Sequence, residues 1–168
     1  MKRITALILS AAILCALLCA CGKSAFTEDD ISIRVNGETI DTHSSVSAIL
    51  DAFGPDYAFS EAISCVYTGM DKTYQYPDLF LYTYPDGEND RLMEVYCTAD
   101  VETAKGIGLG ASLKDIEAAY GSGYTRAGVT VTYSLPAPDK QTLPATLYFE
   151  LDGDTVCAIG ITSAHRAE

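Results

Sequence analysis

Two stretches of this sequence share one pattern: SVSAILDAFG at residues 45–54 and SLKDIEAAYG at residues 112–121. Each begins with a serine that can cap a helix, spaces its apolar residues three or four apart, and ends at a glycine. An aromatic residue lies in the last turn of each. We therefore expect two short amphipathic helices, and their similarity indicates an internal duplication.

Strand-like segments follow each expected helix. After the first helix they are CVY at 65–67, LFLYTY at 79–84 and LMEVYCT at 92–98. After the second helix the spacing recurs, because Tyr133 and Tyr148 lie 66 residues beyond Tyr67 and Tyr82. Segment 31–41 precedes both expected helices. It alternates apolar and polar residues and has Asn36-Gly37 at its centre, which predicts a β-hairpin.

These patterns predict an α+β fold of two tandem repeats, each a short helix followed by an antiparallel β-meander. The helices would pack on one face of a sheet and leave the other face open. The expected boundaries are an N-terminal β-hairpin at 31–43, a first repeat at 44–105 and a second repeat at 106–168.

The N-terminus has the pattern of a targeting signal. Met1-Lys2-Arg3 is basic, residues 4–18 are uncharged and apolar, and LCACG follows at 18–22. This stretch resembles the bacterial lipoprotein signal, or lipobox. The resemblance implies that residues 1–20 are a signal peptide, that Cys21 becomes the lipidated first residue, and that the protein is held to the extracytoplasmic side of the cell membrane. The small polar segment 21–30 would be a flexible tether.

The net charge of the chain argues against some classes of binding partner. Without residues 1–20 the sequence has 9 basic and 23 acidic residues, a net charge of −14. Such an excess disfavours nucleic acid and polybasic attachment to anionic lipid. It suits a solvated surface or a partner with a basic face.

The second helix lies in the motif GASLKDIEAAYG at residues 110–121. This motif, repeated on a lipoprotein, resembles the β-lactamase inhibitory protein fold and the related SmpA/OmlA small-lipoprotein domain. The resemblance implies binding of proteins through the sheet face, with no catalysis. The segment 64–74, SCVYTGMDKTY, is also similar to uncharacterised lipoproteins of Gram-positive anaerobes, which implies no function.

The chain has 11 tyrosines and no tryptophan. Tyrosine combines a large apolar area with a polar tip, which suits an interface. Pairing of the rings within the fold explains the same residues equally well. Tyr82 and Tyr84 lie two apart and should share one face of the sheet. The candidate binding surface comprises Tyr67, Tyr74, Tyr76, Tyr82 and Tyr84.

Three cysteines follow Cys21, and the residues aligned with Cys65, Cys97 and Cys157 in the other repeat are apolar. We expect them to fill core positions as small hydrophobic side chains. A bridge between Cys65 and Cys97 would need a strand order other than the meander. The spacing of cysteines and histidines fits no metal site, and the acidic turn 86–90 matches no complete calcium loop.

Catalysis has little support, because nothing marks a nucleophile near either of the only histidines, His43 and His165, and G-x-S-x-G does not occur. We expect neither enzyme activity nor a cofactor. The favoured function is a lipid-anchored binding module that contacts a protein of the cell envelope through an open sheet face. The alternative is an accessory lipoprotein that binds a small molecule, glycan or ion through the tyrosine-rich strip.

Overall fold

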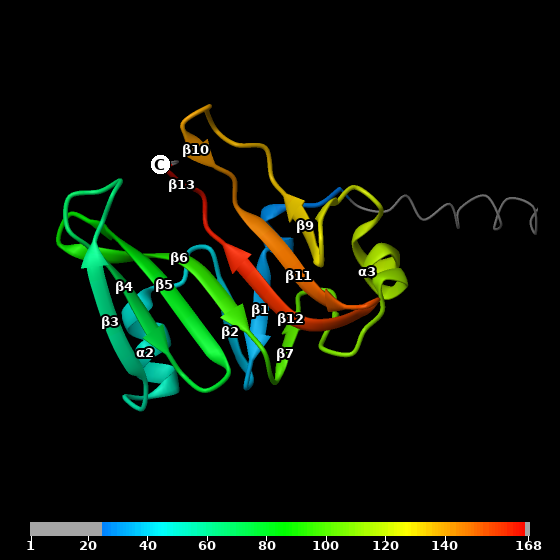
Figure 1. Ribbon diagram of the computed structural model, residues 1–168, viewed down its shortest axis with the longest axis horizontal. Helices are drawn as coiled ribbons and strands as arrows, with labels where there is room; N and C mark the ends of the chain where they lie inside the picture. Colours follow the sequence, from blue (N-terminus) through cyan, green and yellow to red (C-terminus); the bar gives the residue numbers. More distant parts are fainter. Residues whose placement is uncertain (1–24, 167–168) are drawn as a thin grey trace, which may run out of the picture.

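The computed structural model describes residues 25–166, which form a mostly β body of two layers (Figure 1). The expected signal peptide and the lipidation site Cys21 lie outside the described residues. Within the described part, no helix is both long and apolar enough to cross a membrane.

One antiparallel sheet of eight strands runs through the body (Figure 1). At its centre β6 (Asn89–Cys97) pairs with β12 (Thr155–Thr162), so segments far apart in the sequence lie side by side. In spatial order the strands are β3 (Ala58–Ile63), β4 (Met70–Gln75), β5 (Leu79–Asp86), β6 (Asn89–Cys97), β12 (Thr155–Thr162), β11 (Thr146–Asp152), β9 (Thr130–Ser134) and β8 (Thr125–Ala127).

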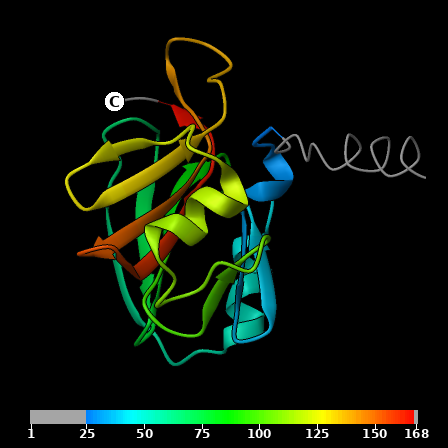
Figure 2. The same ribbon diagram turned by 90° about the vertical axis from the view of Figure 1, so that its right-hand side faces the viewer.

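A second layer covers one face of this sheet. Figure 1 shows β1 (Ser32–Val35) and β2 (Glu38–Asp41) behind β6 and β12, and in the turned view of Figure 2 these blue segments lie to one side of the red and orange strands. A short pair, β10 (Thr142–Leu143) and β13 (His165–Arg166), lies near the C-terminus. The covering layer consists of the sheet β2 (Glu38–Asp41), β1 (Ser32–Val35) and β7 (Val101–Thr103) with the helices α2 (Val46–Phe53) and α3 (Leu113–Tyr120).

Strand alternation separates the two faces of the main sheet. In β5, Leu79, Leu81 and Thr83 are buried, whereas Phe80 and Tyr82 between them are only half-buried. Successive side chains of a strand point to opposite faces, so the buried set faces the second layer and the other set faces solvent. We call these the covered face and the open face. The covered face contributes Leu81, Val95, Ile159, Ile161, Leu147, Phe149 and Val131 to the core.

Both helices begin and end where their sequences predict. The hydroxyls of Ser45 and Ser112 each accept a hydrogen bond from the backbone three residues on, which satisfies one otherwise unpaired N–H of the first turn. Gly54 and Gly121 end the helices at φ 80° and 87°, a conformation that favours glycine.

The expected α+β fold of two helix-plus-meander repeats is wrong. The described chain is 49% strand and 13% helix, with only two α-helices and large antiparallel sheets. Each helix has eight residues, too few for the pair to cover an eight-stranded sheet, and the sheet β2-β1-β7 covers much of the rest. The similarity of the two helical stretches reflects shared caps and apolar spacing, which are local. It does not determine strand partners, which are set by contacts distant in sequence.

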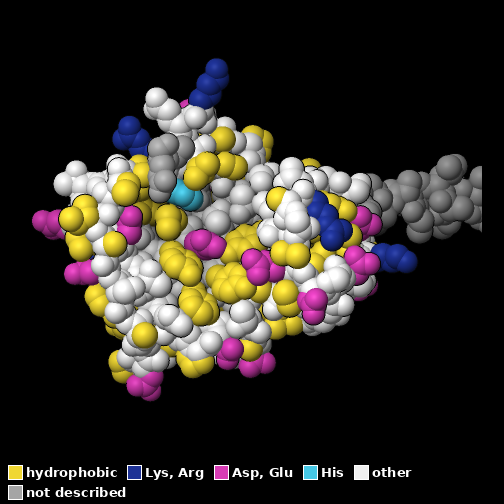
Figure 3. All heavy atoms as spheres, viewed as in Figure 1, with side chains coloured by type: hydrophobic (Ala, Val, Ile, Leu, Met, Phe, Trp, Pro, Cys, Tyr) yellow, Lys and Arg dark blue, Asp and Glu magenta, His cyan; other side chains and the backbone are white. Residues whose placement is uncertain are grey.

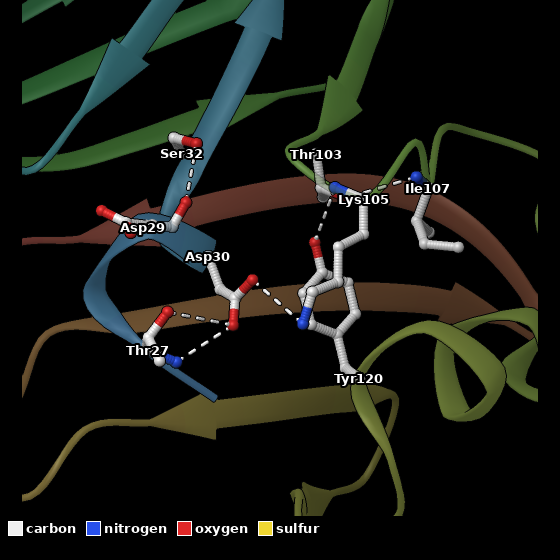
Figure 4. A network of polar contacts seen from close by, with 8 residues as sticks. All are labelled: Thr27, Asp29, Asp30, Ser32, Thr103, Lys105, Ile107 and Tyr120. Atoms are coloured by element: carbon white, nitrogen blue, oxygen red, sulfur yellow. Dashed lines mark hydrogen bonds and ion pairs between the residues drawn. The ribbon is translucent and has the colours of Figure 1, made fainter. Parts of the chain in front are cut away.

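The segment expected to be a flexible tether is folded where the structure describes it. Residues 28–30 form a 3₁₀ turn, η1 (Glu28–Asp30). Phe26 packs against the rings of Tyr120 and Tyr133, and buried Asp30 pairs with Lys105 (Figure 4). Residues 25–30 are therefore part of the folded body and pack on the side of the molecule that carries α3.

We expect Tyr133→Phe to lower the free energy of unfolding by about 1 to 2 kcal/mol. The buried Tyr133 hydroxyl donates to the carbonyl oxygen of Gly121 at 2.5 Å, and its loss leaves that acceptor without its partner at the end of α3. Urea denaturation measures the change. Tyr57→Phe is the matched control, because the Tyr57 ring packs in an aromatic cluster but its hydroxyl has no hydrogen-bond partner in the described chain. An equal loss of stability in both variants would contradict a stabilising hydrogen bond from Tyr133 to Gly121.

Candidate binding site

The open face carries a group of aromatic and acidic side chains at its centre. The strand register places them on β5, β6 and β11, and all of them are half-buried. Figure 3 views the molecule from this side and shows apolar side chains and carboxylates gathered over these strands. No second layer built from residues 25–166 covers them. The group comprises Phe80, Tyr82, Glu94, Tyr96, Tyr148 and Glu150.

Two tyrosine–glutamate pairs cross at this centre. The Tyr96 hydroxyl donates to Glu150 Oε2 at 2.9 Å, and the Tyr148 hydroxyl donates to Glu94 Oε1. Both bonds span β12, the strand between β6 and β11. The rings of Tyr96 and Tyr148 are stacked, with centroids 6.5 Å apart and planes inclined by 20°. We call these four residues the crossed Tyr–Glu cluster.

Gly160 on β12 makes the crossing sterically feasible. It pairs with Tyr96 on one side and with Tyr148 on the other, directly beneath the rings. A Cβ at this position would overlap the ring of Tyr148. Glycine inside a strand often marks a place where another group approaches the backbone closely, and here that group is a phenol ring.

The environment of the cluster favours neutral phenols. Burial, followed by the hydrogen bond to Glu150, raises the pKa of Tyr96 to about 12. Burial, followed by the hydrogen bond to Glu94, raises the pKa of Tyr148 well above its usual range. Both phenols therefore remain hydrogen-bond donors at neutral pH and hold the two carboxylates in place.

A pH titration tests this arrangement. We expect Glu150→Gln to lower the pKa of Tyr96 from about 12 toward the ordinary value of 10.0, because the acceptor loses its charge. The pKa of Tyr148 should stay raised, since its bond to Glu94 remains. NMR titration of the tyrosine ring carbons resolves the two residues. Equal shifts of Tyr96 and of the distant Tyr133 would contradict the pairing.

The raised phenol pKa also predicts how stability depends on pH. An unfolded phenol ionises near 10.0, whereas Tyr96 keeps its proton to about 12. Its contribution to stability is therefore complete below pH 10 and is lost as the pH rises through about 12. We expect this alkaline loss to be smaller in Glu150→Gln.

The tyrosines expected to form the binding surface are divided between the two faces. Tyr82 and Tyr84 lie on the open face, and Tyr67 stacks on Tyr84 at 4.6 Å between centroids. Tyr74 and Tyr76 are 8% and 7% exposed on the opposite side, in an aromatic group under α2. Tyr74 and Tyr76 therefore do not belong to the open face, although Tyr74 lines one pocket together with Tyr84.

The cysteines and histidines of the described chain form no reactive group. Cys97 is in the core, where burial raises its pKa to about 12, but Cys65 and Cys157 are exposed, so their expected core positions are wrong. These three thiols are free. His165 lies beside the backbone oxygen of Ser163. The described residues contain no group of three or more potential metal-ligating side chains.

A half-enclosed pocket of about 640 Å³ lies between the start of α2 and the β5–β6 hairpin. Leu50, Tyr74 and Tyr84 line it, together with Asp90, whose Oδ2 is 2.8 Å from Lys72 Nζ. That hydrogen bond raises the pKa of Lys72 above its usual value. His43 lines the pocket too, and its Nε2 lies 3.0 Å from Glu28 Oε1.

The pocket wall shows no arrangement for nucleophilic catalysis. The hydroxyl of Ser44 bonds to Asp41, and that of Ser45 caps α2. Within residues 25–166 no serine hydroxyl bonds to His43, as a nucleophile paired with its base would.

A scan against protein-family models and searches of curated proteins and of solved structures find nothing that matches this chain. The function is therefore inferred from the geometry of the open face.

Sequence reasoning missed the centre of this face. Glu94 and Tyr96 are two apart, as are Tyr148 and Glu150, so each pair shares a face. Gly160, a glycine between Ile159 and Ile161 in a strand-like run, was the available sign of a close approach. No local signal indicated that β6 and β11 flank the same strand, and only that placement brings the pairs together.

Proposed function

We propose that the protein is a lipid-anchored binding module on the extracytoplasmic side of the membrane, which contacts another protein of the cell envelope through the open face. The single observation that carries this proposal is an eight-stranded sheet with one face left bare around half-exposed aromatic rings. Rigid aromatic side chains are the residues that most often supply binding energy at interfaces.

The position of the N-terminal segment supports this orientation. Phe26 contacts Tyr120 and Tyr133, which belong to the covered side of the molecule. The described chain therefore begins on that side, away from the open face. An anchor attached there leaves the open face accessible to a partner.

Site-specific photocrosslinking tests the proposal. A benzophenone amino acid replaces Tyr82 on the open face in the full-length anchored protein, in cells that make it naturally. Phe59 is the matched control, since it is aromatic, 50% exposed and in register with Tyr74 on the opposite face. We expect one discrete protein adduct from position 82 and none from position 59. The same adducts from both positions, or none from position 82, would refute the proposal.

The pocket of about 640 Å³ supports a second candidate function, the binding of a small molecule or glycan. Tyr74 and Tyr84 could contact an apolar ring, and the surrounding hydroxyls could bind polar groups. We expect native mass spectrometry of protein taken from its own membranes to show a bound small molecule. The bulky substitution Leu50→Trp should remove it. If both proteins show only the unliganded mass, the small-molecule function is ruled out and protein binding remains as the one proposal.

A further inference from the structure

We propose that the crossed Tyr–Glu cluster receives an arginine side chain from a basic surface of the partner protein. This inference rests on the proposed function and specifies the chemistry of the partner. It is carried by the charges of the open face, by the unused oxygens of its carboxylates and by the geometry of its rings.

The carboxylates at the centre of the open face have no basic partner among the described residues. Glu94 and Glu150 form no ion pair with any described residue. The four central strands β5, β6, β12 and β11 contain one basic residue, Arg91, which already pairs with Asp86 at 2.8 Å. A partner that brings a cation removes the repulsion between like charges on this surface, whereas an acidic partner increases it.

A third carboxylate on the open face, that of Asp71, also favours a cationic partner. Asp71 is opposite Ala62 in the register and lies on the side of β4 away from Lys72. Its Oδ1 is buried and has no hydrogen-bond partner in the described chain. A buried acceptor without a donor is costly. Asp71 also adds a negative charge to this face, which a cationic partner offsets.

The carboxylates of the cluster each keep one oxygen available. Tyr148 occupies Oε1 of Glu94, and Tyr96 occupies Oε2 of Glu150. The remaining oxygens accept no hydrogen bond within residues 25–166, and neither is an unpartnered buried atom. They can therefore accept hydrogen bonds from a group that arrives from solvent.

The rings favour a planar cation. Those of Tyr96 and Tyr148 are nearly parallel, and Phe80 flanks Tyr96 with ring centroids 5.9 Å apart. A guanidinium group stacks on aromatic faces and carries five donors in one plane, so it can contact a ring and a carboxylate together. Lysine offers only a compact charge, which gives it no advantage from parallel rings.

The experiment uses defined probes. Hexa-arginine, hexalysine and hexaglutamate peptides are titrated into the isotope-labelled protein, and backbone amide shifts are followed by NMR. We expect hexa-arginine to shift Tyr96, Tyr148 and Gly160, hexalysine to bind several-fold more weakly, and hexaglutamate to leave these amides unmoved. Equal binding of hexa-arginine and hexalysine would overturn the choice of arginine.

A charge-matched pair of variants separates a site from general attraction. Glu94→Gln with Glu150→Gln should raise the dissociation constant of hexa-arginine at least tenfold. Asp51→Asn with Glu61→Gln removes the same charge from exposed positions outside the open face and should change it little. Equal weakening by both pairs would overturn the inference. The proposed function would survive that result if the crosslinked adduct at position 82 persists in Glu94→Gln/Glu150→Gln, so the two failures are distinguishable.

Discussion

Replacing Asp30 with alanine is expected to lower the free energy of unfolding by about 3 kcal/mol, the largest loss that we predict for a single substitution. Asp30 Oδ1 is 3.0 Å from Lys105 Nζ, and its Oδ2 accepts a hydrogen bond from the backbone of Thr27 (Figure 4). The two paired side chains are only 10% and 25% exposed. Removing the carboxylate leaves a partly buried ammonium group without its counter-ion.

The location of this pair increases the effect. Lys105 Nζ also lies 4.7 Å from the centre of the Tyr120 ring, so the ammonium group links η1 to α3. Loss of Asp30 weakens the docking of Phe26, which packs on the same tyrosine. Truncation of one partner of a buried pair costs more than the pair contributes, because the remaining charge has lost its solvation.

Urea denaturation of Asp30→Ala and of Asp29→Ala tests this prediction. Asp29 is the neighbouring carboxylate, it is exposed, and only its backbone oxygen takes part in a described hydrogen bond. We expect Asp29→Ala to change stability by less than about 0.5 kcal/mol. In Lys105→Met the further change Asp30→Ala should cost much less than in the natural protein. Equal losses in both backgrounds would show that the pair is not coupled.

The sequence predicts the local elements of this fold well for a physical reason. The serine caps, the terminal glycines and the Asn36-Gly37 turn act through hydrogen bonds and backbone angles within a few residues. The pairing of β6 with β12 is different, because it joins residues 94–97 to residues 159–162. No turn between these strands sets their register, so the eight-stranded sheet could not be read from local patterns.

For the tyrosines of the candidate site, too, local sequence patterns do not determine the tertiary arrangement. Tyr74 and Tyr76 are two apart, as are Tyr82 and Tyr84, and each pair shares a face as a period of two requires. The period does not say which face a second layer will cover. A shift of one residue exchanges the faces, so an open tyrosine and a buried one look alike in the sequence.

Gly160→Ala is expected to lower the free energy of unfolding by about 2 kcal/mol and to weaken partner binding at the open face. The added methyl group would overlap the Tyr148 ring, which lies over this position. The ring must move away, and the hydrogen bond from its hydroxyl to Glu94 breaks. The pKa of Tyr148 should then fall toward its ordinary value, which NMR titration of the ring carbons detects.

A double substitution distinguishes a clash with the ring from a general intolerance of side chains in β12. In Tyr148→Ala the ring is absent, so Gly160→Ala has free space above the strand. Alanine also loses less backbone entropy than glycine on folding, and the second substitution should stabilise this variant by up to about 1 kcal/mol. The effect of Gly160→Ala thus changes sign with the residue at position 148. A loss of about 2 kcal/mol in both backgrounds would mean that the ring of Tyr148 does not rest on Gly160, and the crossed arrangement of the two tyrosine–glutamate pairs would then be incorrect.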